Sequence, residues 1–221
     1  MTVSTGTNPE NSPKMLMVIG AGGHAKVIVD TLFESNLESS VAGAVDKAPT
    51  TIGKALGKTK IIGDDSILSN VSPTQYHFIV AIGDNTVRST LFKVWKEQGF
   101  TAMSCIHPKS IISDSVSIGE GTAIMAGTVI NCDSTIGDNV IINTNATVDH
   151  DVSIGSHAHI APGSHLAGNI SVGEGAFIGT GATILPGIKI GAWAVVGAGS
   201  IVTRDVLPHR TVWGVSAKLQ D

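Results

Sequence analysis

Residues 118–142 read IGEGTAIMAGTVINCDSTIGDNVII, and this stretch shows the six-residue period that decides the fold. An aliphatic residue stands at every sixth position, namely Ile118, Ile124, Ile130, Ile136 and Ile142. The period continues without a break, because every sixth residue from Ile106 to Val202 is Ile, Leu or Val. Six residues are too few for a helical repeat but suit a short strand and a tight corner. The pattern therefore predicts a solenoid whose aliphatic residues point inward and stack on the next turn.

Glycine often follows the aliphatic residue, as in Ile118-Gly119 and Ile136-Gly137. On these repeats the chain resembles the hexapeptide-repeat acyltransferases, whose six-residue faces wind three to a turn into a left-handed parallel β-helix. The resemblance implies the left hand, since the general crossover rule would favour the right hand. The period has no inserted loop, so another part of the chain must hold an acceptor substrate.

Length and composition set the broad class. At 221 residues the chain can form two modest domains, each with its own core. A net charge of −4 with scattered Lys and Arg argues against nucleic acid as a partner. Cys105 and Cys132 form neither a disulfide framework nor a metal-binding spacing, which favours a cytoplasmic protein with reduced thiols. No apolar run reaches the roughly 20 residues that cross a bilayer.

The first half of the chain alternates between apolar runs and helical patterns. Strands are expected at 15–20, 41–46, 61–63 and 77–83, and helices at 27–37 and 86–98. This alternation predicts an α/β domain with a small Rossmann-like parallel sheet. The expected organisation is a disordered tail (1–14), a Rossmann-like domain (15–103), a left-handed β-helix domain (104–206) and a C-terminal tail (207–221) packed across the last turn.

A glycine-rich turn, Gly20-Ala-Gly-Gly-His-Ala25, follows the first expected strand and opens a helix. It fits the G-x-G-x-x-[GA] pattern, in which glycines let the backbone approach a phosphate and the helix N-terminus attracts its charge. The domain is too small for a full dinucleotide fold, so a nucleoside diphosphate fits as well as NAD, and a tight turn without ligand also fits. His24 can hydrogen-bond a phosphate or a sugar, and Asp46, ending the next strand, can accept from a ribose or a base.

This turn, the stretch Ala81-Ile-Gly-Asp-Asn85 with Arg88 behind it, and the hexapeptide repeats together resemble one family over nearly all of residues 15–218. It is the family of sialic-acid O-acetyltransferase-like sugar acetyltransferases. The N-acetyltransferases of nucleotide-linked 4-amino-6-deoxy sugars, above all those of the bacillosamine pathway, are its most similar branch. The resemblance implies a homotrimer that holds acetyl-CoA between neighbouring prisms and the nucleotide sugar in the N-terminal domain. The substrate-binding residues that it implies are Ala21, Gly22, Gly23, His24 and Asp46.

Four histidines occur within the repeats, at His150, His157, His159 and His165. They hold three different positions in the period, one of them shared by His159 and His165, so they do not form one stripe. An isolated histidine on such a repeat is usually a solvated corner. The segment 143–151, which ends in His150-Asp151, resembles the family's catalytic strand, where a histidine followed by an acid is the general base. Histidine takes up a proton near neutral pH, and a carboxylate raises its basicity. Asp151 replaces the Glu of the most similar relatives, so Asp149 is an alternative partner.

The resemblance implies direct transfer from acetyl-CoA to a 4-amino group, with His150 as the base and no covalent enzyme intermediate. The cofactor-binding residues that it implies are His159 and the main chain at Gly168, Thr180 and Ala198, although corner packing explains the last two side chains as well. No metal is required. The expected acceptor is a nucleotide-linked amino deoxy sugar of bacterial surface-glycan biosynthesis, with UDP favoured and GDP and dTDP left open.

Three other functions stay open from the sequence. O-acetylation of a sialic-acid-like sugar also needs a base, and the sequence does not separate it from N-acetylation. A zinc site like that of the trimeric carbonic-anhydrase-like proteins would use histidines on the same prism, although the spacing differs. A non-catalytic accessory subunit that binds a nucleotide sugar would need the N-terminal domain but not His150.

Overall fold

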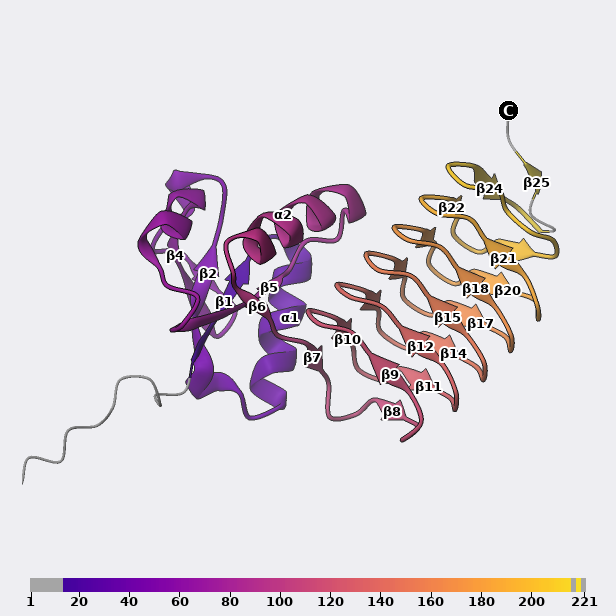
Figure 1. The fold of residues 1–221 in the computed structure, drawn as a ribbon, viewed down its shortest axis with the longest axis horizontal. Helices are drawn as coiled ribbons and strands as arrows, with labels where there is room; N and C mark the ends of the chain where they lie inside the picture. Colours follow the sequence, from indigo (N-terminus) through magenta and orange to yellow (C-terminus); the bar gives the residue numbers. More distant parts are fainter. Residues whose placement is uncertain (1–13, 216–217, 220–221) are drawn as a thin grey trace, which may run out of the picture.

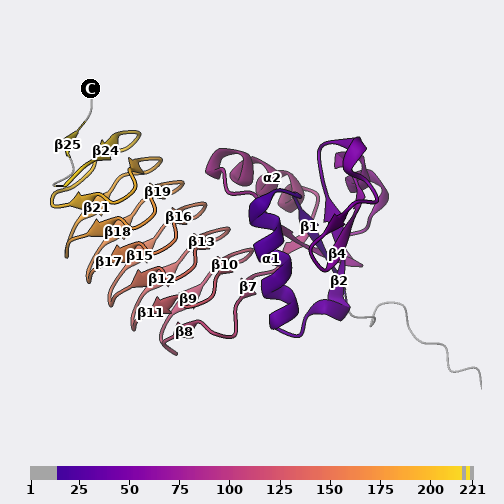
Figure 2. The same cartoon turned by 180° about the vertical axis from the view of Figure 1, so that it is seen from behind.

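The computed structural model describes residues 14–215 and 218–219, so most of the expected N-terminal tail lies outside the described part of the chain. Figure 1 shows an α/β domain on one side and a coil of short strands on the other. Figure 2 shows from behind that α1 runs between the sheet of the first domain and the start of the coil.

The N-terminal domain is a mostly parallel sheet with a helix on each face. Its strands are β1 (Met15–Ile19), β2 (Val41–Val45), β3 (Ala55–Leu56), β4 (Thr59–Gly63), β5 (Tyr76–Val80) and β6 (Thr101–Ala102), in the order β3-β4-β2-β1-β5-β6. Its helices are α1 (Gly23–Glu34) and α2 (Asn85–Glu97), with 3₁₀ turns at Glu38–Ser40, Pro49–Thr51 and Asp65–Asn70. Because α1 packs on Leu16 and Val18 while α2 packs on Met17 and Ile19, β1 is buried on both sides and reads as a continuous apolar run.

Helix α1 begins at Gly23, earlier than the expected start at residue 27, and ends at Glu34 rather than at residue 37. The glycine-rich turn therefore supplies the first helical residues as well as the loop. Helix α2 begins at Asn85, one residue before the expected start, and the carboxylate of Asp84 caps it by accepting the Val87 N–H at 2.9 Å. Gly99 follows its end with φ 85, a left-handed conformation that glycine adopts freely.

The second domain is a triangular coil whose strands fall on three faces. The first face holds β7 (Cys105–Ile106), β10 (Ala123–Ile124), β13 (Ile141–Ile142), β16 (His159–Ile160), β19 (Phe177–Ile178) and β22 (Val195–Val196). The second holds β8 (Ile111–Ile112), β11 (Val129–Ile130), β14 (Thr147–Val148), β17 (His165–Leu166), β20 (Thr183–Ile184) and β23 (Ile201–Val202). The third holds β9 (Ser117–Ile118), β12 (Thr135–Ile136), β15 (Ser153–Ile154), β18 (Ser171–Val172) and β21 (Lys189–Ile190).

Neighbouring strands on a face are parallel and in register, as in Ile124↔Ile142 and Ile142↔Ile160. The residues at every sixth position fill the centre of the coil, and those from Ile124 to Val202 are almost entirely buried. Stacking continues beyond Val206, because β24 (Thr211–Trp213) pairs in parallel with β22 and then turns back into β25 (Lys218–Leu219). Both strands lie in the segment 207–221 that we expected to be a C-terminal tail. Residues 216–217 and 220–221 of that segment are outside the described part of the chain.

The N-terminal domain covers the first face of the coil. Ala25 and Ile28 of α1 share a buried cluster with Cys105, Ala123 and Met125 of that face. A triangular coil has three edges, and the edge between its second and third faces lies opposite the covered face. We call this the His150 edge, because residues 149–152 form one of its corners. The edge between the first and second faces, which includes corner residues 179–182 and 197–200, is called the Thr180 edge.

Candidate active site

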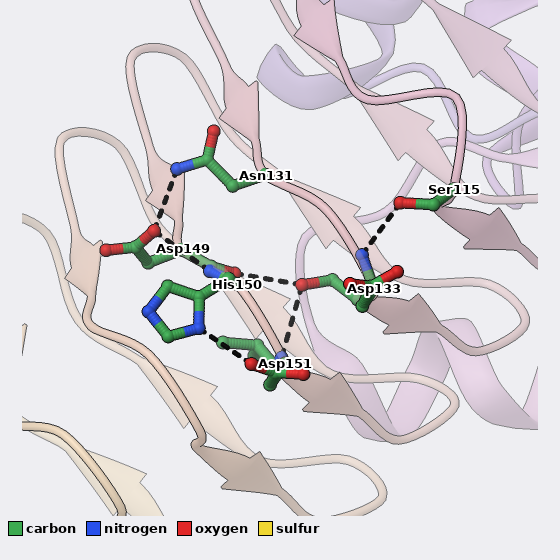
Figure 3. Close-up of polar contacts among 8 residues, drawn as sticks. Ser115, Asn131, Asp133, Asp149, His150 and Asp151 are labelled. Atoms are coloured by element: carbon green, nitrogen blue, oxygen red, sulfur yellow. Dashed lines mark hydrogen bonds and ion pairs between the residues drawn. The ribbon is translucent and has the colours of Figure 1, made fainter.

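His150 lies on the His150 edge, in the corner between β14 and β15 (Figure 3). Its side chain is 55% exposed, and its Nδ1 lies 2.7 Å from Oδ2 of Asp151. The hydrogen bond to Asp151 is the main reason why the pKa of His150 is raised above the usual value of 6.5, and the charge of Asp149 adds to it. A carboxylate on Nδ1 leaves Nε2 free to take a proton from a substrate, which is the arrangement of a general base.

The two aspartates on either side of His150 hold it in different ways: Asp151 bonds its imidazole ring and Asp149 bonds its backbone. Asp151 has φ 58, in the left-handed region that Asp and Asn tolerate better than longer side chains, which gives a physical reason for Asp rather than Glu at this corner. Asp149 does not contact the imidazole. Its Oδ1 accepts the backbone N–H of His150 at 2.9 Å and the side-chain amide of Asn131 at 2.8 Å (Figure 3), so it holds the corner rather than the ring.

Gly168 lies one turn beyond His150 on the same edge, and its Asn169 neighbour donates its N–H to the His150 carbonyl. A Cβ on Gly168 would stand 2.6 Å from Cε1 and Nε2 of the imidazole. The absence of a side chain at this position therefore makes room for the His150 ring. Gly168 was expected to contact acetyl-CoA through its main chain, and the structure adds this direct contact with the histidine.

The N-terminal domain contains a cavity of about 480 Å³ where β1, β2 and the first turns of α2 meet. Ala21, Gly22 and Asp46 line it, together with Ile82 and Thr86. Asp46 is held by its Oδ1, which accepts the Ala48 N–H at 2.9 Å. The N-terminus of α1 has no side-chain cap and no acidic residue in its first turn, so its N–H groups and positive dipole remain available to an anion.

His24 and His159 lie elsewhere, in the interface between the domain and the first face. Their ring centroids are 6.4 Å apart, and His159 is only 7% exposed. Nδ1 of His159 lies 3.3 Å from the Gly83 carbonyl and therefore carries the proton, which leaves Nε2 to accept from the amide of Asn143 at 3.2 Å. Burial lowers the pKa of His159 to about 3 and that of His24 to about 4, and the charge of Arg88 contributes to both. Both rings are thus neutral at physiological pH.

Arg88 joins the two domains. Its guanidinium donates to the carbonyls of Ile82 and Gly83 in its own domain, and to those of Asn139, His157 and Ala158 on the coil. All five of its N–H groups therefore have carbonyl partners although the side chain is 1% exposed. Burial lowers its pKa to about 10, so it stays charged and holds the turn after β5 against two successive turns of the coil.

The expected site residues thus fall in three places. His150, Asp151 and Gly168 share the His150 edge, while Thr180 and Ala198 lie exposed on the Thr180 edge. Of the glycine-rich turn, Gly20, Ala21 and Gly22 line the N-terminal cavity together with Asp46. Gly23 is not among the residues that line it, and His24 turns toward the coil with His159. Because the first face is opposite the His150 edge, one chain does not bring His150 to its own N-terminal cavity.

Sequence reasoning missed the supporting residues Asn131 and Asn143. The first could have been found, since Asn131 and Asp149 are one full turn apart and such residues stack. The interface position of Asn143 depends on how the N-terminal domain sits on the coil. Within residues 14–215, no group of three or more His, Cys, Asp or Glu side chains gathers as a metal ion would need, so the structure adds no support for the zinc alternative. In the same range, no helix combines the length and apolar character that crossing a membrane demands.

Comparison with known sequence families identifies both halves of the chain. The PglD N-terminal domain family matches residues 15–94. The bacterial transferase hexapeptide family, described as six repeats, matches residues 133–168 and 169–204. The expected fold, an α/β domain followed by a left-handed parallel β-helix, is therefore confirmed.

Solved structures resemble the chain along almost its whole length. PerB from Caulobacter crescentus, in complex with CoA and GDP-perosamine, is 43% identical, with 95% of this chain and 99% of that chain covered and a TM-score of 0.88. The acetyltransferase domain of PglB from Neisseria gonorrhoeae, in complex with acetyl coenzyme A, is 35% identical over 95% and 100% of the two chains, with a TM-score of 0.87.

A curated relative matches over a shorter region. UDP-N-acetylbacillosamine N-acetyltransferase from Bacillus subtilis is 38% identical over 116 residues, which are 51% of this chain and 52% of that protein. The alignment thus covers about half the length of that relative. The predicted resemblance to sugar N-acetyltransferases with hexapeptide repeats is confirmed by these matches together.

Proposed function

Because the chain belongs to the family of hexapeptide-repeat sugar N-acetyltransferases that includes PerB, we propose that it acetylates the 4-amino group of a nucleotide-linked amino deoxy sugar with acetyl-CoA. The reaction is direct transfer, in which the amine attacks the thioester carbonyl and loses a proton to His150. The observation that carries this proposal is the exposed imidazole with a carboxylate 2.7 Å from Nδ1 and nothing bonded to Nε2 among the described residues.

The acceptor binds in the N-terminal cavity. Its diphosphate lies at the uncapped start of α1, next to Gly22 and Gly23, where backbone N–H groups and the helix dipole favour negative charge. The nucleoside extends toward Asp46, whose second oxygen is free to accept from a ribose or a base. UDP is the expected nucleotide, and GDP is its direct competitor because the PerB structure contains GDP-perosamine.

The working unit is a homotrimer in which each active site is shared. His150 and the N-terminal cavity lie on opposite sides of one coil, so His150 must serve the cavity of a neighbouring copy. Thr180 and Ala198 on one copy would then face the His150 edge of the next and hold acetyl-CoA between them. Two exposed apolar residues, Ile111 on the second face at 68% and Leu185 at the His150 edge at 40%, support such an interface. The proposed setting is cytoplasmic synthesis of a bacterial surface glycan.

The reaction is tested by thiol release from acetyl-CoA with UDP-, GDP- and dTDP-linked 4-amino-6-deoxy sugars and with a free sialic acid. Release with one nucleotide amino sugar is the expected result and also identifies the nucleotide. Release with the sialic acid alone would replace N-acetylation by O-acetylation. Binding of a nucleotide amino sugar without release would favour the accessory-subunit alternative.

Sharing of the site is tested by mixing two inactive variants. Gly22→Asp fits the backbone, because Gly22 has negative φ and open space around a Cβ, but its carboxylate repels a diphosphate. His150→Ala removes the base. Co-assembled trimers of the two variants pair an intact cavity with an intact His150 at about a quarter of the sites, so activity returns if neighbours share the site. Mixed trimers without activity would place the complete site within one chain.

A further inference from the structure

The second face of the coil carries one line of outward-pointing side chains, because the residue before each inward-pointing aliphatic residue points the other way. From the first turn to the last, the line consists of Ile111, Val129, Thr147, His165, Thr183 and Ile201. Each residue pairs in register with the next, so they stack directly along the coil. We propose that three copies of His165 bind one zinc-like divalent metal ion on the three-fold axis of the trimer.

This inference rests on the trimer of the proposed function, which sets the direction of the second face. The His150 edge of one copy meets the Thr180 edge of the next, and the second face lies between these two edges. In a closed ring of three copies, the face between the two contacting edges must look toward the axis. The same line of each copy therefore borders the axis, with the three His165 side chains at one height.

The other two faces are unsuited to the axis. The N-terminal domain covers the first face. The outward residues of the third face are exposed and hydrophilic, as suits a surface in water: Ser117, Thr135, Ser153, Ser171 and Lys189. The second face instead has apolar residues at both ends of its line, with Ile111 68% exposed in the single chain. Burial against two further copies would remove this apolar surface from water.

The width of a face sets the size of the gap at the axis. Six residues span at most about 20 Å, and the centre of a triangle with sides of that length lies about 6 Å from each side. An imidazole that stands out from its strand, followed by a metal–nitrogen bond of about 2 Å, bridges such a distance. Three His165 side chains can therefore reach one ion at the centre of the trimer.

The ring of His165 is already oriented for this role. Its Nδ1 lies 2.9 Å from Oγ1 of Thr147, one turn earlier on the same line. When Nδ1 donates its proton to this hydroxyl, Nε2 at the far end of the ring keeps its lone pair for a metal. Within the described part of the chain, Nε2 has no hydrogen-bond partner. Thr147 thus acts as the outer partner that fixes a metal-binding imidazole.

The surroundings of His165 favour a cation over an empty channel. Val129 and Ile201 lie two turns away on either side, so the trimer would enclose the three imidazoles between apolar layers. Buried polar atoms need partners, and three Nε2 lone pairs that face one point cannot satisfy one another. Three imidazoles and a water are a complete set of ligands for zinc. The ion would stabilise the assembly by binding only to the trimer, without a part in acetyl transfer.

The test uses tag-free protein stripped of metal with a chelator and titrated with zinc chloride by calorimetry, while sedimentation measures its mass. We expect the wild-type protein to bind one zinc ion per three chains and to gain thermal stability. His165→Gln can still bond Thr147 and should remain a trimer, but it should bind zinc at least about 100-fold more weakly. His209→Gln, which changes another exposed histidine, is the matched control and should bind zinc as the wild type does.

No zinc binding by a wild-type trimer would overturn the inference and leave the proposed function intact. One ion per chain, or equal binding by His165→Gln, would also overturn it and assign the metal to another place, such as the His150–Asp151 corner. A wild-type monomer would remove the shared site of the proposed function together with this inference. A trimer that binds zinc through His165 but acetylates no nucleotide amino sugar would keep the inference and reject the proposed reaction.

Discussion

The His150 edge and the covered first face put two histidines of one coil in opposite environments. His150 is 55% exposed, and the Asp151 carboxylate raises its pKa. His159 is 7% exposed, and burial lowers its pKa to about 3. Both histidines were expected to lie in the active site, His150 as the base and His159 at the cofactor. The comparison teaches that, on a regular coil, the side chain's role follows from which face is covered rather than from its local sequence.

The strongest test of this contrast is His150→Ala. We expect kcat to fall by about 100-fold or more, because the exposed imidazole is the proton acceptor that we propose. Folding, trimer formation and acetyl-CoA affinity should be unchanged, since the side chain supports no core. Steady-state kinetics measures kcat and sedimentation measures trimer formation, with His209→Asn as an exposed control. Near-normal turnover in His150→Ala would remove His150 from the mechanism.

Low pH should lower the stability of the fold through the two buried histidines, His24 and His159. The folded-state pKa values of His24 and His159, about 4 and about 3, lie below the unfolded value of 6.5, so the unfolded chain binds more protons below pH 6.5. The free energy of unfolding should therefore fall as pH falls from 6.5 toward 4, by about 1.4 kcal/mol per pH unit for each histidine. Urea unfolding at pH 7, 6 and 5 measures this loss.

The matched variant for this effect is His159→Gln, which can still donate to the Gly83 carbonyl and accept from Asn143 but does not titrate. Its unfolding free energy should depend less steeply on pH than that of the wild-type protein. His209→Gln, at an exposed position near the end of the coil, should leave the wild-type slope. Parallel curves for wild type and His159→Gln would show that the buried ring is not the acid-sensitive group.

Asp151→Asn should lower turnover about tenfold and change its pH dependence. The hydrogen bond to Asp151 raises the pKa of His150. Since a general base works only when unprotonated, we expect wild-type activity to rise with pH through that raised pKa if His150 is the base. Without the carboxylate the pKa of His150 falls, and the rise should move to lower pH. An unmoved pH profile in Asp151→Asn would assign the shift to Asp149, whose own variant Asp149→Asn gives the comparison.

Much of this could be predicted from the sequence because the coil repeats. The six-residue period fixes which residues enter the core, and residues one turn apart stack, so the corner of His150 and the turns of Thr180 and Ala198 follow from counting. The central strands β1, β2 and β5 were found because both faces of the sheet are buried there and the runs are apolar. The two-residue strands β3 and β6 were missed. The start of α1 was missed by four residues, since glycines gave no helical pattern there.

The contacts between domains could not be predicted in the same way. Arg88 was noted as part of a motif, yet three of its five carbonyl partners, Asn139, His157 and Ala158, lie 51 to 70 residues away in the sequence, and no local pattern marks them. The same holds for His159, whose partner Gly83 lies in the other domain. The cavity of about 300 Å³ between the start of α2 and the first face of the coil also depends on how the N-terminal domain packs on the coil, because half of its lining residues belong to the coil.

Gly168→Ala gives the smallest and most local test of the His150 edge. Its Cβ would stand 2.6 Å from the imidazole, so the ring must turn away from its present position while the surrounding coil, held by backbone hydrogen bonds, keeps its register. We expect turnover to fall several-fold, with little change in acetyl-CoA affinity, because orientation of the base affects the chemical step more than binding. If acetyl-CoA affinity fell instead and turnover at saturation were normal, Gly168 would act through the cofactor, as the family resemblance implied. Ser171→Ala, an exposed change on the neighbouring strand, should alter neither property and so separates this effect from a general disturbance of the coil.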